Sequence, residues 1–177
     1  MKIVFGLGNY GDRYAYTYHN MGFLTAECLA DKLGFKFKKR ECDGLIAEGN
    51  RGGERLIIVK PLTYMNLSGV CVKQVVRKYK AELKDIIVVF DDIDIPRLTL
   101  RVRMNGSGGT HNGMRNIIDV MGSGDFPRVR VGIGRPPEHF DLGDYVLSEV
   151  PRADRQAFYD LIDSAADEVL KLVDGKN

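Results

Sequence analysis

Two histidines stand where a general base could act, and an asparagine follows each of them. His19 and His111 both lie where a loop passes into an expected helix, directly before Asn20 and Asn112. A neutral imidazole can accept a proton from water near neutral pH. A lone histidine at a helix start is more often a cap or a surface residue, so a catalytic role requires a partner that orients the ring.

A cluster of carboxylates offers such a partner. Asp91, Asp92 and Asp94 follow the continuously apolar run Ile86–Phe90, which is typical of a buried central strand. In α/β sheets, ligand sites form at the carboxyl ends of strands. Asp91 could orient a histidine, or the carboxylates could hold Mg²⁺, or they could cap the turn. Without identified partners, turn capping is the preferred interpretation.

Three asparagines stand at loop-to-helix transitions that could open on one edge of the sheet. These are Asn9, Asn66 and Asn112. An amide both donates and accepts hydrogen bonds without carrying charge, which suits the holding of a water and a carbonyl together. For Asn66, helix capping is the simpler interpretation.

A glycine motif near the N-terminus resembles a dinucleotide fingerprint but lacks its context. Gly6, Gly8 and Gly11 follow an expected strand. The fingerprint requires a helix to begin at once, so that its N-terminus meets the pyrophosphate. Here the helix is expected only near Asn20, so the motif is interpreted as a sharp exit from the strand that places Asn9 over the edge of the sheet.

Covalent catalysis is poorly supported. The sequence has no Gly-x-Ser-x-Gly motif. Its three cysteines, Cys28, Cys42 and Cys71, are far apart and lie in expected helices or beside acids, so neither a disulfide framework nor a zinc site is predicted. In an enzyme with these residues, water is the expected nucleophile.

The surrounding pattern predicts a single α/β domain over 1–177, with a sheet flanked by helices. Expected strands cover 2–7, 45–48, 55–59, 86–90, 98–103 and 129–133. Expected helices cover 20–33, which Gly34 should end, then segments around 72–79 and 114–121, and a C-terminal helix that begins near Pro151. A surface loop over 135–150 could act as a mobile lid.

Charge is distributed unevenly over the 177 residues. Residues 1–137 carry 22 basic and 14 acidic side chains, a net +8, whereas 138–177 carry 4 and 10, a net −6. A basic surface is expected where a protein meets phosphates, although solvated strand and helix faces are the simpler explanation. No apolar run approaches the roughly 20 residues of a membrane helix, and no secretory signal is expected.

Ordered motifs over residues 3–150 resemble those of bacterial peptidyl-tRNA hydrolases. They are Gly6–Asn9 with Tyr14, Thr17, His19, Asn20 and Gly22; Lys60 and Pro61 with Met65–Gly69; Asp91–Pro96; Gly106 and Ser107 with His111–Gly113; Arg128–Pro136; and Asp144–Leu147. Because these motifs are long and follow in order, the resemblance is far more specific than any single motif.

The resemblance implies a cytoplasmic, monomeric α/β hydrolase with a twisted mixed sheet, which cleaves the ester between a peptide and the 3′-terminal ribose of tRNA during translation and ribosome rescue. It implies no metal, cofactor or membrane. By position, His19 matches the catalytic base and Asp91 its partner carboxylate. The family's other site positions are matched by Asn9, Asn66 and Asn112, which hold substrate and water; by Tyr14 and Met65, which line the cleft; and by Arg103, Arg115 and Arg130, which contact tRNA.

Four departures from the common family pattern affect loops rather than catalytic groups. Tyr10 stands where proline is usual, Tyr18 where arginine is usual, Thr110 where glycine is usual, and Arg97 with Leu98 where a Pro-Gly turn is typical. The alternative function on the same fold is a non-catalytic RNA-binding protein, which would have no need of the base.

Overall fold

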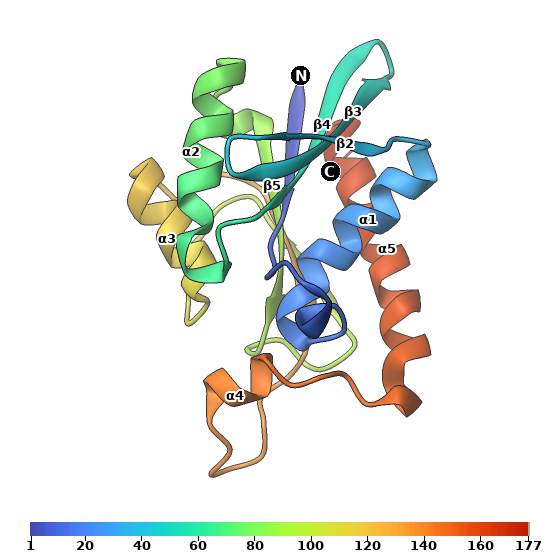
Figure 1. Ribbon diagram of the computed structural model, residues 1–177, viewed down its shortest axis with the longest axis vertical. Coiled ribbons are helices and arrows are strands. Elements are labelled where there is room, and N and C mark those ends of the chain that lie inside the picture. The colour runs from blue at the N-terminus through green and yellow to red at the C-terminus, as the bar shows by residue number, and fades with distance from the viewer. Residues whose placement is uncertain (177) are drawn as a thin grey trace.

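The computed structural model describes residues 1–176, and its seven strands form one mixed sheet (Figure 1). The order across the sheet is β2-β3-β4-β1-β5-β7-β6. Neighbours β4, β1, β5 and β7 run parallel, while β2, β3 and β6 pair antiparallel. The strands are β1 (Lys2–Gly6), β2 (Phe37–Glu41), β3 (Gly44–Arg51), β4 (Glu54–Pro61), β5 (Ile86–Asp92), β6 (Leu100–Arg103) and β7 (Arg128–Gly132).

Helices cover both faces of this sheet. They are α1 (Met21–Leu33), α2 (Ser68–Tyr79), α3 (Asn112–Met121), α4 (Leu142–Val146) and α5 (Arg155–Val173). Helices α1 and α5 lie on one face and α2 and α3 on the other (Figure 1). Alternate residues of β1 show why: Val4 packs into the core with α1 and α5, whereas Ile3 and Phe5 pack into the core with α2 and α3. The predicted α/β architecture is confirmed.

Two features of the fold differ clearly from the sequence expectation, one unexpected strand and one helix start. Strand β2 was not expected, because its residues Phe37–Glu41 are mostly charged; it lies at the edge of the sheet, where lysine and arginine side chains reach solvent. The C-terminal helix begins at Arg155 rather than near Pro151, since a separate 3₁₀ turn occupies Arg152–Asp154.

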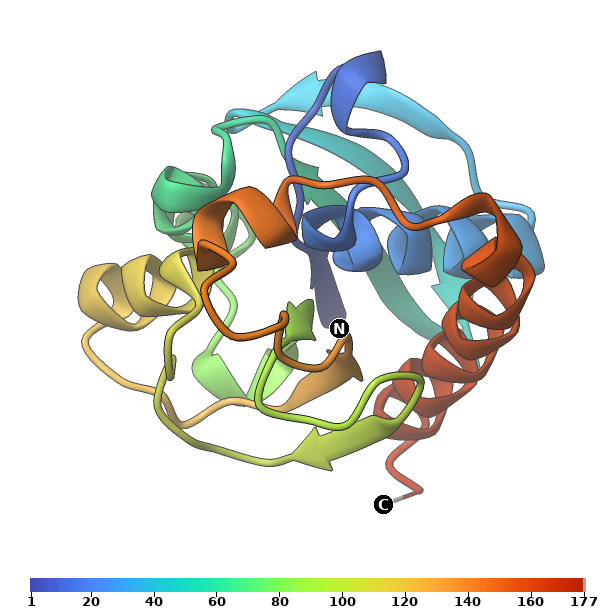
Figure 2. The ribbon, with the colours of Figure 1, turned by 90° about the horizontal axis from the view of Figure 1, so that it is seen from below.

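The carboxyl ends of the parallel strands meet at one edge of the molecule. The loops that follow β1, β4 and β5 all emerge there, and α4 lies across them (Figure 2). The start of α1 approaches this edge very closely, because a Cβ on Gly22 would lie 2.4 Å from the Leu7 nitrogen and from the Val89 oxygen. Glycine is therefore required at the crossing that brings the residues before α1 to the end of β5.

The segment 135–150, which the sequence predicts to be a surface loop, contains α4 and is joined to the loop after β1. The Val150 N–H donates to the Tyr16 carbonyl (2.9 Å), and Thr17 forms an isolated bridge with Glu149. Within residues 1–176, no helix has the length and apolar character needed to cross a membrane.

Candidate active site

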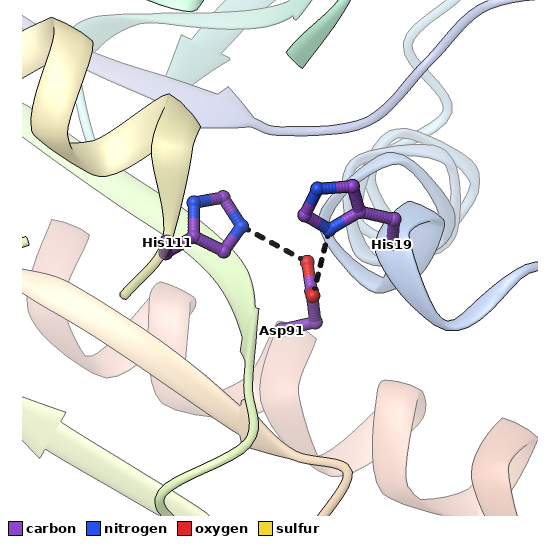
Figure 3. A group of neighbouring side chains, drawn as sticks. All are labelled: His19, Asp91 and His111. Carbon is purple, nitrogen blue, oxygen red and sulfur yellow. Dashed lines mark hydrogen bonds and ion pairs between the residues drawn. The ribbon is translucent and has the colours of Figure 1, made fainter. Parts of the chain in front are cut away.

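A buried carboxylate at the end of β5 lies between two histidines from different elements (Figure 3). Asp91 Oδ2 is 2.8 Å from His19 Nδ1, and Asp91 Oδ1 is 3.1 Å from His111 Nε2. His19 lies in the 3₁₀ turn before α1, and His111 is the residue that directly precedes α3. The Asp91 side chain is 1% exposed, so both of its oxygens obtain their hydrogen bonds from these rings.

The hydrogen bonds determine which nitrogen of each ring carries the proton. His111 caps α3, and its Nδ1 accepts from the Met114 N–H (3.2 Å), so its proton is on Nε2, which donates to Asp91. His19 Nδ1–H donates to the other oxygen of Asp91. His19 Nε2 is then the unprotonated nitrogen, and no residue of 1–176 hydrogen-bonds to it, so it is available as a base.

The two histidines keep Asp91 ionised. Burial by itself would raise the pKa of the Asp91 carboxyl, but the hydrogen bonds and charge interactions with His19 and His111 outweigh burial and hold the pKa well below its usual range. A permanently charged carboxylate accepts stronger hydrogen bonds than a neutral acid. The orienting role for Asp91, which the sequence left beside two alternatives, is the one that matches its contacts.

The Mg²⁺ interpretation does not fit this cluster, and turn capping fits Asp92 but not Asp91. Asp92 accepts from the Asp94 N–H and pairs with Arg130 at 2.8 Å, while Asp94 pairs with Arg135. The three carboxylates therefore have different partners, and only Asp92 caps the turn.

A metal on His19, Asp91 and His111 is also disfavoured, although their ligand atoms lie within 4.8 Å of one another. Coordination through His111 Nε2 would move its proton to Nδ1. That nitrogen would then face the Met114 N–H as a second donor, and the cap of α3 would be lost.

A second set of contacts holds Asn9 rigidly at the end of β1. Its main-chain N–H donates to Asn20 Oδ1 (2.8 Å), and Asn20 Nδ2 donates to the Asn9 carbonyl (2.9 Å). Its side-chain Oδ1 accepts from the Met65 N–H at 2.7 Å. Since Oδ1 is occupied, Nδ2 is the group that Asn9 can offer to a ligand.

The remaining predicted residues on this side have different environments. Met65 is buried, and a Cβ on Gly113 would lie 2.6 Å from its sulfur, so Met65 packs against the start of α3. Tyr14 is half-buried. Asn66 is exposed in the 3₁₀ turn Met65–Leu67, so the expectation that it caps α2 is wrong; the cap position is Leu67.

A pocket of about 350 Å³ includes the His19–Asp91 pair in its wall but not Asn9 or Met65. His19, Asp91 and Asn112 line it together with Arg103 and Arg130. Three of the polar residues expected to meet substrate thus share one cavity with the base. Arg115 does not line this pocket; it lies exposed on α3, and its Nε donates to the Gly109 carbonyl.

Arg128 is a buried part of this pocket, and the sequence placed it in a family motif without predicting a role for it. Its guanidinium donates to the carbonyls of Ser107, Gly124 and Phe126, and no residue of 1–176 forms an ion pair with it. Burial and the nearby charge of Arg130 lower the pKa of Arg128 to about 10, so it remains charged at neutral pH. Arg128 therefore adds positive charge to the wall of the pocket.

The cysteines fit the expectation that no thiol acts as nucleophile. Burial raises the pKa of all three thiols, that of Cys71 to about 12. A thiol with a raised pKa is protonated at neutral pH and is a poor nucleophile.

Comparisons with known proteins agree over almost the whole chain. The family model for peptidyl-tRNA hydrolase matches residues 3–177. A peptidyl-tRNA hydrolase of Chloroflexus aurantiacus is 45% identical over 170 residues, covering 96% of this chain and 90% of the relative. One of Alkaliphilus oremlandii is 43% identical over 173 residues, covering 98% and 93%. The crystal structure of the peptidyl-tRNA hydrolase of Acinetobacter baumannii superposes with a TM-score of 0.92 at 34% identity, covering 99% of this chain and 90% of that one.

A mixed sheet that carries a buried histidine–carboxylate pair at the carboxyl ends of its parallel strands is the arrangement of an α/β enzyme whose site can activate water. The comparisons narrow this class to one family. The chain belongs to the peptidyl-tRNA hydrolase family, as its motifs predict, and its activity is hydrolysis of peptidyl-tRNA. None of the comparisons favours the non-catalytic alternative.

Two contacts of the site were missed by sequence reasoning. His111 was considered as a possible base or cap and Asn20 as a neighbour of His19 in a family motif, and neither was predicted to bind a catalytic group directly, as each does. The repeated His-Asn pair was the available signal. It could not show that His111 and His19 reach opposite oxygens of one carboxylate.

Proposed function

We propose that His19 is the general base for the hydrolysis of peptidyl-tRNA. The observation that carries this proposal is the contact between His19 Nδ1 and the buried Asp91, because it leaves Nε2 free to accept a proton. A water on Nε2 attacks the ester carbonyl, and the proton passes to His19. The same proton then goes to the departing 3′ oxygen of the ribose, which leaves free tRNA and peptide.

Asn9 is proposed to stabilise the negative charge that develops on the carbonyl oxygen. Its Nδ2 is the amide group not used in holding Met65, and the contacts with Asn20 prevent the loop from turning away. A donor held in place before the reaction stabilises the developing oxyanion without reorganisation. Asn66 and Asn112, which are both exposed, are proposed to bind peptide or water beside it.

The arginines are proposed to bind the phosphates of the acceptor stem. Arg103 and Arg130 line the pocket that His19 also lines, which would place a bound phosphate group near the ester. Arg115 is proposed as an outer contact, since it lies on the exposed surface of α3. Phosphate contacts position a nucleic acid without reading its base sequence, which suits an enzyme that acts on many tRNAs.

We further propose that the chain acts as a monomer in the cytoplasm, during translation and ribosome rescue. All described strands join one sheet, and that sheet carries the whole site, so no second subunit is needed to complete it.

The test is a comparison of His19→Ala with the unaltered protein. We expect His19→Ala to lose nearly all hydrolysis of peptidyl-tRNA, by a factor of about 10² to 10⁴, because a positioned base contributes roughly this much. Its tRNA affinity should remain within about twofold, since His19 carries no proposed phosphate contact. Single-turnover cleavage of a labelled peptidyl-tRNA and a filter-binding assay measure the two quantities, and substantial turnover by His19→Ala would refute the assignment.

A further inference from the structure

Tyr18, the residue before His19, lies in a cluster with Arg97, Tyr145 and Phe158, which we call the Tyr18 junction. Its ring stacks on Tyr145 of α4 with centroids 4.8 Å apart and planes 28° apart. It meets Phe158 of α5 edge-on at 5.8 Å. Its hydroxyl accepts a hydrogen bond at 2.6 Å from Arg97, in the loop between β5 and β6. Tyr18 is 4% exposed, so the turn that carries His19 is anchored inside the protein.

Main-chain hydrogen bonds hold this turn to the segment that follows α4. The Tyr18 N–H donates to the Ser148 carbonyl at 3.2 Å, and the Val150 N–H donates to the Tyr16 carbonyl at 2.9 Å (Figure 2). The bond from Arg97 to the Tyr18 hydroxyl adds a link to the loop after β5, the strand whose Asp91 binds the His19 ring. The His19 turn is therefore tied to β5 and its loop twice, through the imidazole and through the neighbouring residue.

Arg97 can serve as a rigid link because its guanidinium has several partners at once. Nη1 donates to the Tyr18 hydroxyl, and Nη2 pairs at 2.9 Å with Asp154, the residue before α5. The guanidinium carbon lies 5.0 Å from the centre of the Phe158 ring, within the range of a cation–π contact. A planar guanidinium holds its donors in a fixed fork, so it loses little freedom when it forms these bonds.

We propose that Arg97 is a positioning residue that holds His19 in its orientation through Tyr18. This proposal rests on the function proposed for His19 above. Without Arg97, the hydroxyl of a tyrosine that is 4% exposed would lose its donor, and a buried polar group without a partner costs free energy. The turn could relieve this cost only by moving, which would displace His19 Nε2 from the water that it activates, and small displacements of a catalytic group slow a reaction.

Two departures from the family pattern thus meet at the turn of the base. Tyr18 and Arg97 both stand where other residues are usual, and neither is itself a catalytic group. The contact between them belongs to this chain's version of the turn, and it can be removed without changing any residue of the proposed site.

Tyr18→Phe and Arg97→Met remove the two ends of this hydrogen bond. Tyr18→Phe is the milder change, because it keeps the ring between Tyr145 and Phe158. We expect the single-turnover rate at saturating enzyme to fall about three- to tenfold in each variant, the size that loss of one hydrogen bond of ordinary strength permits. The double variant should fall no further than the slower single variant, because both changes remove the same bond. The tRNA affinity of Tyr18→Phe should stay within about twofold.

A second readout observes His19 without measuring activity. The proton that His19 Nδ1 shares with Asp91 has a nuclear magnetic resonance that is assigned by its loss in His19→Ala. Its exchange with water reports how firmly the ring is held, and we expect faster exchange in Tyr18→Phe than in the unaltered protein. Faster exchange with an unchanged rate of hydrolysis would uphold the positioning of His19 and count against its proposed role as the base.

Arg51→Met is the matched control for Arg97→Met. Arg51 pairs at 2.8 Å with Asp174, at the other end of α5, and its side chain is 31% exposed against 33% for Arg97. Both variants should lower the melting temperature, but Arg51→Met should leave the hydrolysis rate and the proton exchange unchanged. An unchanged rate together with unchanged exchange in Tyr18→Phe and Arg97→Met would overturn the proposal. So would an equal loss of rate in Arg51→Met, since Arg97 would then matter only for stability.

Discussion

At the residue scale, the distinctive feature of the site is one carboxylate shared by two histidines with different tasks. Asp91 orients His19 through Oδ2, and His111 donates to Oδ1 from a ring that is itself held by the Met114 N–H. Without His111, one oxygen of a carboxylate that is 1% exposed would lose its donor. We therefore propose that His111 is a positioning residue, which acts through Asp91 on the base proposed above.

Two substitutions separate this role of His111 from its role as a helix cap. We expect His111→Ala to lower the free energy of unfolding by about 1 kcal/mol or more through loss of the cap, and to lower kcat on the order of tenfold through loss of a hydrogen bond to a charged group. His111→Asn should recover most of the stability, because asparagine is a good cap, but not kcat.

Chemical denaturation and single-turnover kinetics measure these two effects. KM should change little in both variants, since His111 acts on the base and not on the tRNA. Full kcat in either variant would show that His111 is only a cap.

At the element scale, the close approach of α1 to the ends of β1 and β5 determines where the base lies. At this approach Gly6 of β1 and Gly22 of α1 have no room for a Cβ, since a Cβ on Gly6 would lie 2.2 Å from the Gly22 carbonyl oxygen. Two residues that depart from the family pattern, Tyr18 and Arg97, contact each other near this crossing. Arg97 donates to the Tyr18 hydroxyl at 2.6 Å and pairs with Asp154 at 2.9 Å, so the unusual tyrosine has an unusual arginine as its partner.

Leu98, in the same turn, has a backbone conformation that favours glycine. Its φ is +64°, where a side chain is strained, and the Leu98 side chain is 39% exposed. We expect Leu98→Gly to raise the free energy of unfolding by up to about 1 kcal/mol, because relief of the strain exceeds the small loss of burial and of unfolded-state restriction.

Urea denaturation measures this change. The control is Leu147→Gly, at an exposed leucine with φ −89°, where glycine relieves no strain and should lower stability. A Leu98→Gly variant that is less stable than the unaltered protein would contradict the prediction.

At the scale of the whole molecule, the basic side chains gather at one part of the site. The excess of positive charge in residues 1–137 includes the pocket arginines Arg103, Arg128 and Arg130, whereas the stacked rings of Tyr10 and Tyr64 do not line that pocket. Strand β6 shows how the fold exposes this charge: Arg101 and Arg103 are exposed, and Leu100 and Val102 are half-buried against the core, because successive side chains of a strand point to opposite faces.

The phosphate role of Arg103 predicts a change in salt dependence. We expect Arg103→Ala to weaken tRNA binding and to reduce the slope of log affinity against log salt by about one, because one phosphate contact fewer releases one counterion fewer. Arg40→Ala is the control, since Arg40 is exposed on β2 at the opposite edge of the sheet. Filter binding at salt concentrations from about 50 to 300 mM measures this slope. An unchanged slope for Arg103→Ala would refute the phosphate contact.

Much of the fold could be predicted because its signals are local. Apolar runs predicted six strands, periodicity predicted the four longer helices, and Gly34 ends α1 in the left-handed conformation that only glycine adopts freely. Strand β2 could not be predicted, since an edge strand with charged side chains has no apolar alternation to detect. Asn66 does not cap α2 as expected, because it lies inside a 3₁₀ turn that precedes the helix. The hydrogen bond from the Met65 N–H to Asn9, a tertiary contact, holds this turn in place.

The sequence by itself determined which chemical groups this protein carries and where they stand along the chain: a histidine before a helix at position 19, a carboxylate at the end of a central strand, amides at loop ends, and arginines alternating along one strand. These follow from residue types and short-range order, which are written in the chain. Only the tertiary structure decided the pairings, since Asp91 meets residues 72 and 20 positions away, and Asn9 meets one 56 positions away. Hydrogen bonds over such separations depend on how the sheet is ordered and how closely its helices pack, and no local pattern records either.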